Sequence, residues 1–188
     1  MKRTVFALLV PMLLPLTAQA EDRMNALGLT LDPLMADTES PAGDRDEKHG
    51  PRFGLEYART VWPRLDLFFG AGAHRIRLEE AGAKTRVNLY DIRLGARQYF
   101  LARQVQAWSP FVELAVGEAW VRNEESTVGD SRRYDGWSAA LGAAKRLSEN
   151  TDLRFSVGYQ RMRTDDKRND YTDVYSTAEL RAAVMVRY

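Results

Sequence analysis

An all-β fold, a closed up-and-down barrel of eight antiparallel strands, is predicted by three features of the 188-residue sequence. From residue 50 onward, apolar and polar residues alternate with a period of two in segment after segment, as they do in strands with one apolar face. The connections between these segments alternate between short and long. No segment after the N-terminal region carries a long helical stripe of apolar residues with caps, so helices should be short or absent.

The last segment shows the alternation most clearly. In residues 177–188 every even-numbered residue, from Ala178 to Tyr188, is apolar, whereas Glu179, Arg181 and Arg187 occupy odd positions. Successive side chains of a strand point to opposite faces, so this strand has one apolar and one polar face. The same alternation recurs in residues 52–57, 65–78, 91–97, 112–117, 137–144 and 153–160.

Two segments are less regular. In residues 65–78 the apolar residues change from odd to even positions after Ala73, which predicts a β-bulge between Gly72 and Arg75. The weakest strand runs from Leu27 to about Asp32, and we expect it to end at Pro33 because proline has no backbone N–H. With this strand included, the sequence predicts eight strands.

The connections predict how the strands are arranged. Short connections fall at residues 63–64, 101–106 and 148–150, and mostly longer, polar ones at 33–50, 79–85, 122–133 and 164–173. Eight antiparallel strands place the four longer connections at one end, the loop end, and the short ones with both termini at the other, the terminal end. This arrangement favours an up-and-down closed barrel.

The N-terminus predicts export across the inner membrane. Residues 1–20 combine a basic start, an apolar run from Val5 to Leu16 and the small-residue stop at Ala18-Gln19-Ala20, which is a secretory signal pattern. Residues 21–188 are then expected to form a single domain. Because no later window offers the roughly 18 uncharged apolar residues of a spanning helix, entry into a membrane would require a β-barrel.

Composition excludes several functions. The absence of Cys excludes disulfides, thiolate chemistry and Cys-ligated zinc, and the balance of 27 basic against 26 acidic residues argues against a nucleic-acid partner. Acidic residues in the first and last long connections lack the spacing of an EF-hand, so we expect no metal site there. We also expect no cofactor.

The polar face predicts which side of the sheet is inside. It mixes glycines with charges of both signs, and arginine dominates, with 22 Arg against 5 Lys. The interior of an eight-stranded barrel is about one side chain wide, and the guanidinium group suits close ion pairs. We therefore predict an interior ion-pair network that plugs the barrel, with a gated ion or proton path as the lesser alternative. Its predicted members are Glu56, Asp91, Arg93, Arg97, Glu113, Arg154, Glu179 and Arg181.

Aromatic residues favour a lipid-facing apolar surface because they gather near both ends of the strands, as in the girdles of membrane barrels. The alternative is a soluble, lipocalin-like carrier whose apolar face lines a cavity. The predicted girdles are Trp62, Tyr99, Phe100, Trp108 and Tyr188 at the terminal end, and Tyr57, Trp120, Trp137, Tyr159 and Tyr175 nearer the loop end.

The chain ends on Val184-Met185-Val186-Arg187-Tyr188, which resembles the terminal assembly signal of bacterial outer-membrane proteins. With the signal peptide and the strand pattern, residues of about 24 to 188 resemble a small eight-stranded barrel of the OmpA/OmpX type. The resemblance implies residence in the cell outer membrane. It also implies contact with outer-membrane lipid and lipopolysaccharide, and with the assembly machinery through the strand that ends in Tyr188.

Arginines near the loop end are candidates for contact with lipopolysaccharide, because a guanidinium group matches a phosphate with two hydrogen bonds. Ion pairing with nearby glutamates at the barrel rim is an equally supported interpretation, and both can occur together. The candidate residues are Arg75, Arg77, Arg122, Arg132, Arg133, Arg161 and Arg163, with Arg86 beside them.

Catalysis has little support in the sequence. Known lipid-A deacylase barrels carry a His and a Ser two residues apart on one strand, but Gly72 and Ile76 flank His74 at that spacing. His49 lies in the first long connection and is expected to be exposed and idle. We therefore predict a structural or surface-interaction protein without catalytic residues. A lipid-A-modifying acyl hydrolase, with His74 as the residue to test, is the alternative.

Overall fold

The computed structural model describes residues 25–39, 46–80, 83–101, 107–123, 131–166 and 171–188. The expected signal peptide lies outside these described residues. Within them, no helix is long and apolar enough to cross a membrane. The strands are β1 (Asn25–Glu39), β2 (Asp46–His49), β3 (Arg52–Trp62), β4 (Leu65–Glu80), β5 (Ala83–Tyr99), β6 (Trp108–Asn123), β7 (Ser131–Arg146), β8 (Thr151–Asp166) and β9 (Tyr171–Arg187).

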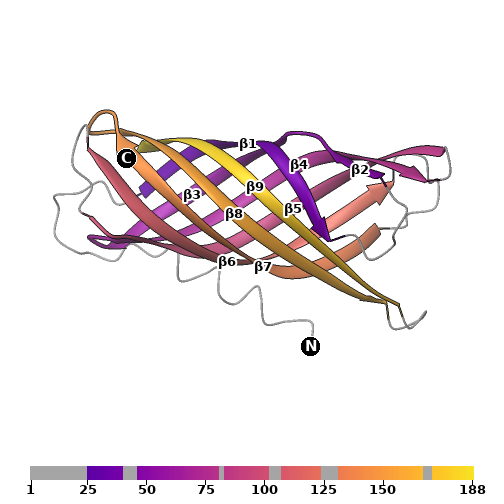
Figure 1. Ribbon diagram of the computed structural model, residues 1–188. Coiled ribbons are helices and arrows are strands. Elements are labelled where there is room, and N and C mark those ends of the chain that lie inside the picture. The colour runs from indigo at the N-terminus through magenta and orange to yellow at the C-terminus, as the bar shows by residue number, and fades with distance from the viewer. Residues whose placement is uncertain (1–24, 40–45, 81–82, 102–106, 124–130, 167–170) are drawn as a thin grey trace.

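All strands belong to one antiparallel sheet that closes on itself, which confirms the predicted barrel (Figure 1). The order is β2-β4-β3-β1-β9-β8-β7-β6-β5, and β5 pairs back with β4. The short strand β2 continues the line of β3 along β4, since His49 faces Ile76 and Phe53 faces Ala73. Between them, the backbone N–H of Gly50 donates to the carbonyl of Arg75 at 2.8 Å. The barrel therefore has eight strand positions, and one of them is shared by β2 and β3, with an interruption at Gly50.

The strands at the loop end are longer than the sequence predicts. β4 and β5 pair as far as Glu80 and Ala83, and β8 and β9 as far as Asp166 and Tyr171, inside segments expected to be connections. The expectation fails because these segments have no apolar face to alternate with a polar one. Backbone hydrogen bonds continue a hairpin where both faces are polar, and period-two reasoning does not detect such a strand.

Pro33 does not end the first strand. β1 continues to Glu39 beside β9, and the pairing between the two strands shifts register between Leu31 and Leu34. A register shift at this point accommodates a residue that cannot donate a ladder hydrogen bond. The prediction of a connection from Pro33 to Gly50 is therefore wrong for residues 33–39 and for β2, where His49 is a strand residue.

The predicted bulge in β4 is also wrong. Pairing between β4 and β5 runs without a shift from Leu65 opposite Gln98 to Glu80 opposite Ala83. His74 and Ile76 are buried on the inner face, and Ala73 and Arg75 lie on the outer face. The apolar residues change from odd to even positions because beyond Ala73 the inner face becomes apolar and the outer face polar, and not because the strand contains a bulge.

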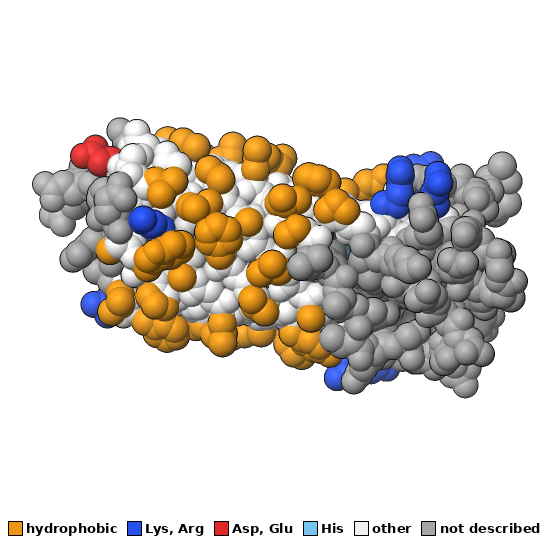
Figure 2. Space-filling model, turned by 45° about the horizontal axis from the view of Figure 1, so that its top comes forward, with side chains coloured by type: hydrophobic (Ala, Val, Ile, Leu, Met, Phe, Trp, Pro, Cys, Tyr) orange, Lys and Arg blue, Asp and Glu red, His pale blue; other side chains and the backbone are white. Residues whose placement is uncertain are grey.

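The apolar face of the sheet is the outer surface of the barrel. Leu29 and Leu141 are each 67% exposed and Val157 is 63% exposed, whereas charged residues such as Arg97 are buried. Figure 2 shows hydrophobic side chains spread over the wall, with Lys and Arg at either end of this band. This orientation contradicts the lipocalin-like alternative, which requires the apolar face inside.

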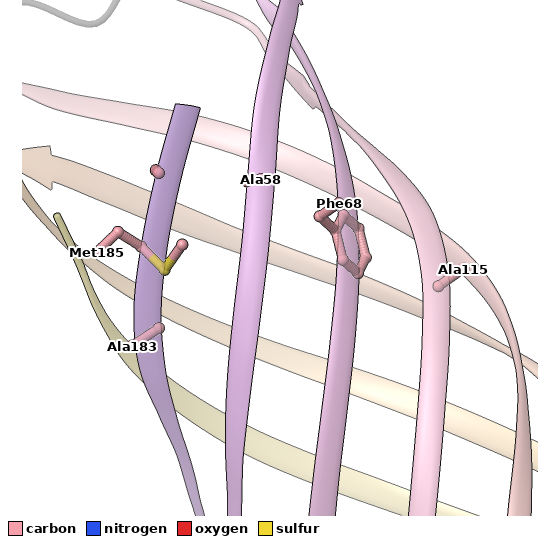
Figure 3. Packing of buried hydrophobic residues seen from close by; sticks show 6 residues of the cluster. Ala58, Phe68, Ala115, Ala183 and Met185 are labelled. Atoms are coloured by element: carbon pink, nitrogen blue, oxygen red, sulfur yellow. The ribbon is translucent and has the colours of Figure 1, made fainter. Parts of the chain in front are cut away.

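Small apolar clusters fill the interior near both ends. At the terminal end, Phe68, Met185 and alanines of four strands pack together (Figure 3). Gly28 makes this packing possible, because a Cβ there would lie 2.4 Å from the Met185 sulfur. Near the loop end the inner faces of β4 to β8 contribute Ile76, Val87, Leu89, Ala119, Tyr134 and Met162 to a second cluster.

The aromatic girdles are partly as predicted. Trp62, Phe100, Trp108 and Tyr188 are exposed at the terminal end. Tyr99 is not a girdle residue, because it is 1% exposed and packs inside against Phe111 with ring centroids 5.6 Å apart. Nearer the loop end, the outward aromatic residues are Tyr90, Trp120, Trp137 and Tyr159. The Tyr57 hydroxyl donates a hydrogen bond to Asn25 at the start of β1. The side chain of Tyr175 is outside the described set.

Candidate functional site

Charged side chains fill the middle of the barrel. Arg97 of β5 lies between two glutamates and binds both Glu56 carboxylate oxygens at 3.1 Å. It also donates from Nη2 to Glu113 Oε2 at 2.5 Å. Arg154 of β8 contacts Glu56 at 2.8 Å from the other side. Four strands are thus joined by side chains across the interior.

A second arginine, Arg181, links Glu113 to other strands of the barrel. Arg181 of β9 donates to Glu113 at 2.7 Å, to Asp32 of β1 at 3.2 Å, and to Glu179 on its own strand. Arg93 of β5 reaches Glu179 at 3.4 Å. Because successive pairs share a member, they form a continuous network, which we call the ion lattice.

Two lattice residues, Arg52 and Asp32, are not among the predicted members. Arg52 donates two hydrogen bonds to Asp91, at 2.6 and 2.8 Å, and one to Asp32 at 2.8 Å. Arg52 occupies the polar face of its strand together with Glu56, and this parity could have identified it. A Cβ on Gly72 would lie 2.3 Å from Arg52 Nη2, so the glycine makes room for the guanidinium group.

The ion lattice is neutral in sum and tightly packed. A buried charge is costly unless an opposite charge and hydrogen bonds compensate for lost hydration, and here the two signs are equally represented. The network leaves a cavity about the size of one water molecule beside Glu56 and Arg97. Its members are the arginines 52, 93, 97, 154 and 181 and the acids Asp32, Glu56, Asp91, Glu113 and Glu179.

Exposed arginines lie on the outer face of the barrel toward the loop end. They occupy five successive strands, β4 to β8, and we call them the arginine belt. The structure describes the strand positions of Arg77 and Arg132, but their side chains are outside the described set. The described belt residues are Arg75, Arg86, Arg122, Arg133, Arg161 and Arg163.

The belt is not uniform. On the β6–β8 side, Arg133 pairs with Glu118 and, at 3.3 Å, with Asp135. On the β4–β6 side, Arg75 Nε donates to the side-chain oxygen of Asn88 at 3.4 Å. Rim ion pairing therefore occurs at Arg133, with Glu118 and Asp135 as its partners. The glutamates expected as rim partners of the belt, Glu79, Glu80, Glu124 and Glu125, have side chains outside the described set.

Outward aromatic residues lie on the terminal side of the belt. Tyr90 and Trp120 face each other across β5 and β6, and the Trp137 and Tyr159 rings are 5.7 Å apart across β7 and β8. Tyrosine and tryptophan prefer the border between hydrocarbon and headgroups because their rings combine an apolar body with a polar tip. These residues mark the upper limit of the apolar band.

The one histidine with a described side chain is enclosed in the barrel. His74 is 6% exposed and points inward from β4, next in line to Ile76 of the apolar cluster. Among the described residues, no group of three or more His, Asp or Glu is arranged to hold a metal ion. The acidic residues Asp44 and Asp170 lie outside that part of the chain.

A closed antiparallel barrel with an apolar outer wall and buried ion pairs defines an integral β-barrel membrane protein. The sequence matches the outer membrane protein beta-barrel domain over residues 6–187, and the chain belongs to this family. The protein therefore resides in the outer membrane. No curated protein sequence matches it.

Solved structures share the fold at low sequence identity. Neisserial surface protein A is 14% identical with a TM-score of 0.66, covering 90% of this chain and 100% of that one. OprG of Pseudomonas aeruginosa is 10% identical with a TM-score of 0.55, covering 89% and 99%. Ail of Yersinia pestis is 14% identical with a TM-score of 0.53, covering 89% and 100%. At this identity the likeness concerns the fold.

Proposed function

We propose that the protein is a closed, non-catalytic outer-membrane barrel that contacts lipopolysaccharide phosphates through the arginine belt. The observation that carries this proposal is the change on the outer wall from apolar residues to exposed arginines on five successive strands. With the loop end facing outward, these guanidinium groups reach the phosphate layer of the outer leaflet. Arginine binds phosphate with paired, charge-assisted hydrogen bonds.

The register of the strands supports one common height for the belt. Tyr90 of β5 faces Trp120 of β6. Tyr159, the last outward aromatic residue of β8, is instead aligned through successive cross-strand pairs with Ala96, six residues further along β5. Strands of a membrane barrel tilt by about 35–45°, so a boundary parallel to the membrane crosses neighbouring strands at residues that are not paired with each other. The apolar band thus ends at a similar height on β5 and β8.

The interior supports a structural role. The ion lattice occupies the middle of the barrel, and the second apolar cluster lies between it and the loop end. The paired charges, with a cavity of about one water beside Glu56 and Arg97, support an interior closed to hydrated ions. We expect planar bilayers containing the purified barrel to show no stepwise conductance; regular single-channel steps would contradict a closed interior.

The position of His74 argues against the acyl-hydrolase alternative. A catalytic base must reach the bond that it acts on, and the acyl chains of lipid A lie outside the wall. The His74 side chain points to the opposite side of that wall. We therefore expect lipid A from cells with the protein, without it, and with His74→Ala to have the same mass spectrum. A mass change that depends on His74 would restore the enzyme hypothesis.

Contact with the outer-membrane assembly machinery is proposed through the last strand. Tyr188 is 61% exposed, and its backbone N–H donates to Asn25 where β9 meets β1 at the closing seam. An exposed terminal aromatic residue at this seam is accessible to a partner before the barrel closes. We expect Tyr188→Ala to lower the yield of assembled barrel without changing the stability of the molecules that do assemble.

The main test compares lipid A with and without its phosphates. The purified barrel is placed in nanodiscs of neutral lipid, and binding of diphosphoryl lipid A and of dephosphorylated lipid A is counted by native mass spectrometry. We expect binding that depends on the phosphates and weakens as salt is raised, because salt screens exposed charges. Equal binding of both lipids would contradict the proposal.

A further inference from the structure

This inference rests on the proposed contact with lipopolysaccharide and locates it. We propose that the phosphate of a phosphorylated glycolipid binds on the wall formed by β4, β5 and β6, between Arg75 and Arg122 and over Asn88, with Arg86 above. We call this group of four residues the β4–β6 site. The remaining belt arginines then have a lesser part in binding.

The strand register brings these residues together. Arg75 of β4 faces Asn88 of β5, which faces Arg122 of β6. Neighbouring strands are about 4.8 Å apart, so the backbones of the two arginines are about 10 Å apart, within reach of one shared anion. Arg86 lies two residues further out on the same face of β5. Three guanidinium groups thus surround one asparagine.

The chemistry of the β4–β6 site fits an anion. Arg75 Nε donates to the Asn88 side-chain oxygen at 3.4 Å, which holds the Arg75 guanidinium group over β5, beside Arg86 and Arg122. Within the described residues, no acidic side chain forms an ion pair with Arg86 or Arg122. The site therefore contains two guanidinium groups, those of Arg86 and Arg122, whose charge no described carboxylate compensates.

The β6–β8 side of the belt has different chemistry. Arg133 is shared between Glu118 and Asp135, and Asp135 also faces Arg163 across β7 and β8. A phosphate bound there would approach two carboxylates and would compete with them for Arg133. Binding on this side is weaker because part of the gain is lost to repulsion between like charges.

Strand β1 and the loop-end part of β9 differ from the belt strands in their sequence. Neither β1 nor residues 171–180 of β9 contain a Lys or Arg, whereas these segments include Asp37, Glu39 and Asp173. Among the strands with described outward arginines, the basic residues near the loop end thus lie on β4 to β8, and neither β1 nor the loop-end part of β9 carries one. This distribution favours a lipid held on one side of the barrel over a diffuse attraction around the whole rim.

The surroundings favour a membrane lipid over free phosphate. Directly below the β4–β6 site, the outward residues on the next pairing line are Ala73, Tyr90 and Trp120. Below these, Ala71 of β4 and Ile92 of β5 begin the apolar wall, which contacts hydrocarbon, whereas on β6 the next outward residue is Glu118, which is paired with Arg133. An amphiphile whose phosphate lies at the arginines can extend its acyl chains along this wall, and a soluble anion gains nothing from it.

The experiment measures the affinity of the barrel in nanodiscs for diphosphoryl lipid A. The test variant is Arg86→Gln with Arg122→Gln, compared with Arg161→Gln with Arg163→Gln on β8. Arg64→Gln, at the exposed turn between β3 and β4, controls for lost charge at the other end of the barrel. A heat-dependent mobility shift on a denaturing gel verifies that each variant is folded. Inorganic phosphate is added as a competitor in a parallel series.

We expect the β5/β6 double variant to bind lipid A about tenfold or more weakly and the β8 double variant no more than about threefold more weakly. We also expect millimolar inorganic phosphate not to compete. A larger loss in the β8 variant would overturn the location of the site but leave the proposed function standing. Competition by inorganic phosphate would overturn a lipid ligand. Wild-type binding that ignores the lipid phosphates would overturn the proposed function itself.

Discussion

The ion lattice and the arginine belt use the same side chain on opposite faces of the same strands. Arg97 is on the inner face of β5 and is 2% exposed. Its guanidinium group binds two glutamates, and its guanidinium carbon is 4.8 Å from the centre of the Phe68 ring. Arg86 lies further along the same strand, exposed on the outer face. The inner arginine completes a neutral core, whereas the outer one faces a layer of anions.

The comparison shows that position relative to the membrane decides the role of an arginine in this barrel. Below Ala73 the inner face carries the charges and the outer face is apolar. Above it, Ile76 is inside and Arg75 is outside. The strand does not change its geometry at this point, so the exchange is a property of the sequence that follows the change from hydrocarbon to headgroups and water.

The largest expected effect comes from breaking the lattice. Arg97→Gln leaves Glu56 and Glu113 without the charge that lies between them. Removing one partner of a buried pair typically costs about 3–5 kcal/mol, because the other charge stays buried. We expect the free energy of unfolding in lipid vesicles, measured by urea titration, to fall by about this amount. The exposed Arg64→Gln variant should change it by less than about 1 kcal/mol.

A smaller effect is expected when the lattice is crowded. In Gly72→Ala the new Cβ would lie 2.3 Å from Arg52 Nη2 and push the guanidinium group away from Asp91. We expect a loss of about 1–3 kcal/mol in the same urea titration. Gly70→Ala is the matched control on the same face, because its nearest contact would be 3.7 Å away. Equal loss in both variants would mean that Arg52 is not held as described.

Salt should separate the two regions further. The lattice is buried, so its contribution to the free energy of unfolding should change little between low and high ionic strength. The belt is exposed, and binding of lipid A to it should weaken several-fold over the same range, because exposed charges are screened within about 10 Å at 0.1 M salt. Salt-independent binding of lipid A would show that the belt does not provide the affinity.

The smallest effect is expected at Arg133. It pairs with Glu118 and Asp135 at the surface, and an exposed ion pair contributes about 0–1 kcal/mol. Arg133→Gln should therefore leave the midpoint of urea unfolding nearly unchanged. A loss as large as that of Arg97→Gln would place this pair in a buried environment and remove the contrast between the two regions.

Much of the fold was predictable because a lipid-facing strand must alternate. The terminal halves of the strands obey this rule, and it indicates their number, their faces and the interior position of residues such as Glu56 and Arg181. The rule loses its basis beyond the membrane, where β4 extends to Glu80 and β1 passes Pro33. Interior chemistry is also not strictly polar, and Tyr99 belongs to an inner apolar cluster for this reason.

The belt was harder to interpret from sequence. Sequence alone places arginines near the loop end, but it does not decide which acids they meet. The outward position of Arg122 follows from alternation along β6, because Leu114 and Val116 lie on the same face, but the pairing of Arg133 with Glu118 follows from the cross-strand register. Register depends on how the tilted strands close the barrel, and alternation along one strand carries no information about it.

The different roles of the inner and outer arginines are tested by measuring two properties of two variants that lose the same charge. Arg97→Gln and Arg122→Gln are each assayed for the free energy of unfolding in vesicles and for affinity toward diphosphoryl lipid A in nanodiscs. We predict that Arg97→Gln loses stability while its folded fraction binds lipid A as the wild type does, and that Arg122→Gln keeps its stability but binds lipid A more weakly. Stability loss in both variants, or lipid A affinity that depends on Arg97 and not on Arg122, would contradict it.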